Sequence, residues 1–172
     1  MLSADEAGII LLSLKVAGAS VMFSLPLALA CALLLARASF PGKTLFDAIV
    51  HLPLVLPPVV IGYALLVLFG RQGALGALLH DWLGVTLAFR WTGAALAAAV
   101  MGFPLMVRAM RLSIEAVPPR LESAARTLGA SRWRAFYSVT LPLALPGIAV
   151  GVLLAFARSL GEFGATITFV SN

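Results

Sequence analysis

The chain contains an apolar run that is too long for the core of a small soluble domain. Residues 9–36 hold a single charged side chain, that of Lys15. As a helix this run would be about 42 Å long, which exceeds the roughly 30 Å hydrocarbon core of a bilayer. A tilted transmembrane helix accommodates such a length, and Lys15 lies close enough to its start to reach the interface. The run therefore predicts a first membrane span.

The composition of the whole chain favours lipid as its solvent. Of the 172 residues, 62% are hydrophobic and 11% are charged, whereas about a quarter of the residues in a soluble domain are charged. The formal net charge is +5, but the basic residues lie between apolar runs, which is the pattern that orients membrane proteins. We therefore expect no nucleic-acid binding. The single cysteine, Cys31, lies in an apolar run and is expected to be a small packing residue.

Three more apolar runs predict three more spans, at residues 48–69, 91–107 and 141–157. The second of these carries Pro57 and Pro58 in its first half. Proline removes backbone hydrogen bonds, and such a break is tolerated at membrane depth only against protein or a watery cavity. Pro57 and Pro58 are therefore candidates for a pathway or gate. A kink that serves packing alone is the alternative.

The orientation in the membrane follows from the arginines. Half of the basic residues gather between the third and fourth spans, and they are Arg108, Arg111, Arg120, Arg126, Arg132 and Arg134. Positive charge accumulates on the cytoplasmic side of membrane proteins, so residues 108–140 are predicted to form a cytoplasmic loop. The basic turn at 37–43 lies two spans away and falls on the same side. The N-terminus, the 70–90 connection and Asn172 are then outside.

The loop has the pattern of two short helices around a glycine. Pro118 and Pro119 stop the preceding helix, and residues 120–128 repeat apolar or small side chains at spacings of three and four, which gives one apolar face. Gly129 permits a sharp turn, and residues 130–138 continue as the second helix. Such a unit can seat in a groove of another protein. A solvated surface helix held by lipid headgroups is the alternative.

The loop resembles the EAA loop of ABC-importer permeases. That pattern is Glu-Ala-Ala, three residues, Gly, nine residues, an aliphatic residue, one residue and Leu-Pro. The matching positions here are Ala124, Ala125, Gly129, Val139, Leu141 and Pro142. The glutamate position holds Ser123, and the acid stands one residue earlier, at Glu122. In the family this loop forms the coupling helix that fits a groove of the ATP-hydrolysing subunit, so the resemblance implies that role here.

Other stretches resemble the permease subunits of bacterial molybdate importers, among them HLPLVLPPVVIGY at 51–63, FPLMVRAMR at 103–111 and FARSLGEFGATITFVSN at 156–172. The resemblance implies an all-α, multi-pass bundle in the bacterial inner membrane. It also implies a homodimer that works with two ABC ATPase subunits and a periplasmic oxyanion-binding protein. Sulfate and thiosulfate permeases share the GEFG-type ending, so sulfate, thiosulfate and tungstate are alternatives to molybdate. Family members have at least one more span, and we expect this chain to be truncated after its fourth.

A charged pair is expected near the outer face of the membrane. Arg158 and Glu162 are four residues apart and share one face of a helix, with Ser159 beside them. Ionisable residues at such depth usually pair with each other or face a cavity. An internal ion pair that holds helices together is one interpretation. The other makes Ser159 and Glu162 part of an oxyanion path or gate.

The sequence contains no pattern that indicates chemistry of its own. It has no His/Cys/Asp/Glu cluster for a metal, no nucleophile constellation and no GxxxxGK[ST] loop for phosphate. We therefore expect a transport subunit and not an enzyme, without a cofactor, whose ATP is handled by a partner. A non-transporting membrane scaffold is the alternative from another class of protein.

Overall fold

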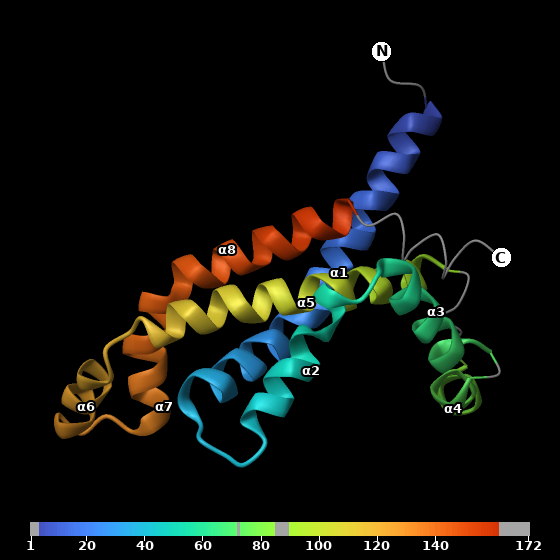
Figure 1. The fold of residues 1–172 in the computed structure, drawn as a ribbon. Coiled ribbons are helices and arrows are strands. Elements are labelled where there is room, and N and C mark those ends of the chain that lie inside the picture. Colours follow the sequence, from blue (N-terminus) through green and yellow to red (C-terminus); the bar gives the residue numbers. More distant parts are fainter. Residues whose placement is uncertain (1–3, 72, 85–89, 162–172) are drawn as a thin grey trace.

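The computed structural model describes residues 4–71, 73–84 and 90–161, and over these ranges its regular structure is helical (Figure 1). Helix α1 spans Ala4–Arg37 and continues through Pro26. It therefore starts before the predicted boundary at residue 9 and ends where the basic turn was expected. Its segment from Ala7 to Arg37 is long and apolar enough to cross a membrane.

The second predicted span is not one helix. Helix α2 (Lys43–Val55) and helix α3 (Pro58–Phe69) are bent by 112° relative to each other. Leu56 and Pro57 between them are extended, with ψ values of 143° and 139°, and each precedes a proline, which disfavours the helical conformation. Pro58 then occupies the first turn of α3, where its missing N–H costs nothing. The pair is a broken span or a re-entrant segment, so the described chain has three or four spans.

Helix α4 (Ala74–Leu83) lies in the connection that follows. Helix α5 spans Trp91–Glu115 and so runs beyond the predicted boundary at residue 107 into the predicted loop. In the most apolar stretch of α5, 61% of the residues are buried. The corresponding shares are 28% in α1 and 22% in the segment that contains the last helix. The third span is therefore the central helix of the bundle.

The segment between α5 and the last helix has the two predicted short helices, α6 (Pro119–Thr127) and α7 (Arg132–Ala135). A π-helical turn (Phe136–Thr140) joins α7 to helix α8 (Leu141–Leu160). Helix α8 runs beside α5, with α1 crossing behind them, and α6 and α7 project from one end of the bundle while α3 and α4 lie at the other (Figure 1).

Close approach of helices holds the bundle together. The core consists of residues from α1, α2, α5 and α8, including Leu35, Met106, Met110 and Ile114. Small residues let α8 approach α5, since a Cβ at Gly151 would lie 3.1 Å from the carbonyl oxygen of Met106. Helices in lipid associate largely through such packing, because lipid tails are as apolar as the side chains. This packing places the ends of α1, α5 and α8 next to α6.

Candidate functional site

Helix α6 presents an unusually open surface. None of its residues is buried, and the leucine that follows it, Leu128, is 89% exposed. Ala124 is exposed and Ala125 is half-buried. We call Leu121, Ala124, Ala125, Leu128 and Gly129 the α6 face. Exposed apolar side chains that gather on one face are a feature of interaction surfaces.

Gly129 ends α6 in the left-handed conformation, with a φ of 90°. The Gly129 N–H donates to the Arg126 carbonyl at 3.0 Å, and the Ala130 N–H donates to the Ala125 carbonyl at 3.1 Å. These two bonds are the Schellman arrangement, which satisfies the last carbonyls of a helix and favours glycine at this position. The sharp turn that the sequence predicted at Gly129 is present. A hollow of about 490 Å³ lies beside it, lined by Ser123, Arg126, Thr127, Ala130, Ser131 and Arg132.

Glu122 points back toward the bundle and not toward the open side of α6. Its Oε1 accepts a hydrogen bond from Arg37 Nη2 at 3.0 Å. The Thr140 hydroxyl donates to the same oxygen. Arg37 and Thr140 were not among the predicted site residues, and the only sequence signal was that Arg37 belongs to a basic turn on the side of the loop. Glu122, the acid that stands one residue before the glutamate position of the family pattern, therefore has two partners within the chain, Arg37 and Thr140.

The other predicted loop residues lie where the chain re-enters the bundle. Val139 is half-buried in the π-helical turn, and Leu141 is half-buried at the start of α8. Pro142 is exposed and sits in the first turn of α8, where proline is tolerated. These three residues set the direction in which α8 leaves the loop. They do not form part of the α6 face.

The predicted path residues fall in separate places. Pro57 and Pro58 form the break between α2 and α3. Ser159 is half-buried, its hydroxyl donates to the Ala155 carbonyl at 2.8 Å, and its Oγ lies 3.0 Å from Ser20 Oγ across the α1–α8 contact. Glu162 lies outside the described residues.

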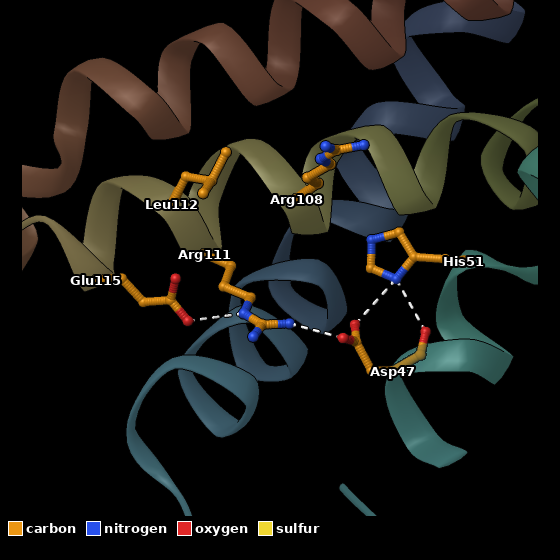
Figure 2. A pocket seen from close by; sticks show the side chains of 6 residues that line it. All are labelled: Asp47, His51, Arg108, Arg111, Leu112 and Glu115. Atoms are coloured by element: carbon orange, nitrogen blue, oxygen red, sulfur yellow. Dashed lines mark hydrogen bonds and ion pairs between the residues drawn. The ribbon is translucent and has the colours of Figure 1, made fainter. Parts of the chain in front are cut away.

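An ion-pair network that the sequence did not predict joins α2 to α5 (Figure 2). Arg111 Nη1 lies 2.9 Å from Asp47 Oδ2, and Arg111 Nε lies 2.8 Å from Glu115 Oε1. His51 Nδ1 is 3.1 Å from Asp47 Oδ1. These groups and Arg108 line a cavity of about 300 Å³. The formal charges of Arg108 and Arg111 balance those of Asp47 and Glu115, and the ion pair between Arg111 and Asp47 links α2 of the bent span to the central helix.

Nothing in the described ranges assembles a metal centre, since no group of three His, Cys, Asp or Glu side chains there could hold an ion. The fold instead defines a membrane-spanning helical subunit with an exposed short helix, α6. The chain belongs to the family described as "Binding-protein-dependent transport system inner membrane component", whose sequence profile matches residues 24–172. It is therefore a permease subunit of an ABC importer in the inner membrane.

Individual relatives differ in their substrates. The chain is 64% identical over 172 residues to the molybdenum transport system permease protein ModB of Escherichia coli (strain K12), covering 100% of this chain and 75% of that protein. The ModB protein of Haemophilus influenzae is 60% identical over 167 residues, covering 97% of this chain and 73% of that one. The sulfate transport system permease protein CysT of Escherichia coli (strain K12) is 42% identical over 142 residues, covering 81% and 50%.

Two solved transporters share the fold. A bacterial ABC transporter involved in the import of the acidic polysaccharide alginate superposes with a TM-score of 0.70 at 19% identity, covering 98% of this chain and 65% of that one. An amino acid ABC transporter superposes with a TM-score of 0.62 at 23% identity, covering 92% and 67%. At such identities the likeness confirms the predicted permease architecture and says nothing of the substrate.

Proposed function

We propose that the chain moves molybdate inward across the inner membrane, as the permease of an ATP-driven importer. The observation that carries this proposal is the identity of 64% over the whole chain to a molybdenum permease, against 42% over 142 residues to a sulfate permease. The chain works as a homodimer, with two copies of an ABC ATPase on the cytoplasmic side and a periplasmic oxyanion-binding protein outside. ATP-driven closure of the ATPases moves α6, and the spans then open outward.

The substrate is tested by uptake of labelled molybdate into cells that carry the full-length gene and its partner genes. We expect energy-dependent uptake that resists a hundredfold excess of unlabelled sulfate. A matched strain without the ATPase gene should take up nothing above background. Uptake that sulfate or thiosulfate abolishes would overturn the molybdate assignment in favour of the sulfate branch, and equal competition by tungstate would extend it to both metals' oxyanions.

The orientation follows from the arginines and can be tested by labelling. In a Cys31→Ser background, we expect Leu128→Cys and Ser39→Cys to react with an impermeant maleimide only after the membrane is opened. Trp82→Cys in α4 should react from outside. All three side chains are exposed, so burial does not limit their reaction. Labelling of Leu128→Cys from the periplasm would overturn the placement of α6 in the cytoplasm.

We propose that the break at Pro57 and Pro58 lines the translocation path, and that Ser159 and Glu162 contribute to its outer part. Replacing both prolines by alanine should lower uptake by about tenfold, because alanine lets α2 continue as a straight helix through residue 56. ATPase copurification should be unchanged. Pro53→Ala is the matched control, since Pro53 lies inside α2 without ending it. Ser159→Val and Glu162→Gln should also lower uptake. Normal uptake in these variants would mean that the prolines serve packing alone.

The rival function is a membrane scaffold that does not transport. It accounts for the apolar helices but not for the exposed α6 face or for the family to which the chain belongs. Copurification of an ABC ATPase with the full-length chain separates the two. A scaffold would retain the protein in the membrane without any ATP-dependent uptake.

A further inference from the structure

Helix α6 is held to the bundle by few apolar contacts. It has no buried residue, and its neighbours in the described chain are chiefly the π-helical turn and α7. Hydrophobic stabilisation is proportional to the apolar area removed from water, so little of it is available to fix the orientation of α6. Its polar contacts therefore decide how firmly it follows the spans.

Arg37 is the centre of those contacts. It lies in the last turn of α1, and its Nη2 donates to Glu122 Oε1 at 3.0 Å, to the Ile114 carbonyl at 3.4 Å and to the Val117 carbonyl at 3.3 Å. The Ile114 carbonyl belongs to the last turn of α5, where a cation compensates the partial negative charge of the helix end, and Val117 lies just beyond that end. One guanidinium thus joins the cytoplasmic ends of α1 and α5 to α6.

Glu122 extends the connection to the remaining span. Its Oε1 also accepts from the hydroxyl of Thr140, which is 1% exposed and immediately precedes α8. Arg37, Glu122 and Thr140 come from positions that are far apart in the chain, yet they meet on one carboxylate oxygen. Every long helix of the bundle core, α1, α5 and α8, is tied to α6 through this point.

We propose that Arg37, Glu122 and Thr140 form a polar latch that transmits the movement of α6 to α1, α5 and α8 during transport. This inference rests on the proposed function, since it assumes that the ATPase moves α6. Arg37, Glu122 and Thr140 are positioning residues that touch neither ATP nor the transported ion. An ion pair whose side chains are 29% and 30% exposed contributes little to stability. Its loss should therefore spare the fold and impair coupling.

The test measures the amount of labelled molybdate taken up per ATP hydrolysed. The full-length permease is reconstituted in liposomes with its ATPase and its binding protein. We expect Arg37→Ala and Glu122→Ala to retain the ATPase and to lower this ratio by about fivefold or more, the lower end of coupling between sites. Thr140→Val should lower it less, because it removes one donor from Glu122 and leaves Arg37 in place. The control is Glu115→Ala, which breaks an ion pair with Arg111 inside α5 and does not involve α6.

A double variant decides whether Arg37 and Glu122 act as one unit. Arg37→Ala with Glu122→Ala should lower the ratio by less than the two single effects combined, because residues that contact each other are not additive. Unchanged ratios in both single variants would overturn the latch, and so would an equal fall in Glu115→Ala. Loss of the ATPase from Glu122→Ala would also overturn it, since Glu122 would then belong to the docking surface itself. If Arg37→Ala does not assemble, Glu122→Gln and Thr140→Val carry the test. Failure of the proposed function is distinguishable, because the wild-type complex would then show no ATP-dependent uptake.

Discussion

Gly129→Asp is expected to abolish molybdate uptake while the permease remains folded in the membrane. Gly129 has a φ of 90°, and a Cβ built on it would meet no atom within 4 Å. Aspartate is among the few residues that adopt the left-handed conformation at small cost. The substitution therefore has little to disturb inside the chain. Its effect falls on whatever contacts the α6 face.

The added carboxylate would stand beside Leu128, which is 89% exposed, at the point where a partner must come closest to the backbone. A charge that is buried in an interface without a partner costs about 3 kcal/mol or more, which is about a hundredfold in affinity. We expect ATP hydrolysis by the ATPase to persist and uptake to be lost. The measurements are the amount of ATPase that copurifies with the permease and the uptake of labelled molybdate.

Gly42→Asp is the matched control for this prediction. Gly42 has a φ of 86° and likewise has no atom within 4 Å of a built Cβ, but it lies in the turn between α1 and α2. The two variants therefore share their backbone conformation, their free space and their new charge. Gly42→Asp should transport normally. Normal transport by Gly129→Asp, or equal loss in both variants, would contradict the assignment of α6 as the docking helix.

Features that depend on neighbouring residues in the chain could be predicted from the sequence. The prolines at 118 and 119 and the glycine at 129 place the ends of α6 correctly, because each acts on its own backbone. The apolar runs identified α1, α5 and α8 as candidate spans, because lipid requires long apolar helices. Their lengths were less well predicted. Helix α5 continues to Glu115 with Met110 and Ile114 buried and Arg108 exposed, so the helix that Pro118 and Pro119 were expected to stop extends eight residues beyond the predicted span.

Features that depend on distant residues could not be predicted. Pro57 predicts a break in the helix. The angle of 112° between α2 and α3 depends on how Ile61 and Leu65 pack against α5. Arg37 and Glu122 are 85 residues apart, and Asp47 and Arg111 are 64 residues apart. No periodicity links such pairs. The family pattern identified the loop, whereas the partners of its displaced acid became apparent only in the folded chain.

Gly147→Ala is expected to destabilise the bundle, because it inserts a methyl group where α8 meets α5. A Cβ at residue 147 would lie 2.5 Å from Ser113 Oγ, closer still to Ser113 Cβ, and 3.2 Å from the Ala109 carbonyl oxygen. The Ser113 hydroxyl also donates to the Ala144 carbonyl at 3.2 Å, so this side chain cannot turn away without losing that bond. Overpacking of this kind costs about 1–3 kcal/mol. Thermal unfolding of the purified full-length permease in detergent measures the loss.

Two further variants identify the cause of that loss. Gly18→Ala is the matched control, because Gly18 is an exposed glycine inside α1 with no atom within 4 Å of a built Cβ. There alanine should be neutral or stabilising, since it is the better helix former by about 1 kcal/mol. Ser113→Gly combined with Gly147→Ala removes the side chain that the new methyl group would meet and should restore most of the stability. If Gly147→Ala alone were as stable as Gly18→Ala, then α5 and α8 could separate without cost. The contact between α5 and α8 would then be a sliding surface and not the fixed part of the permease.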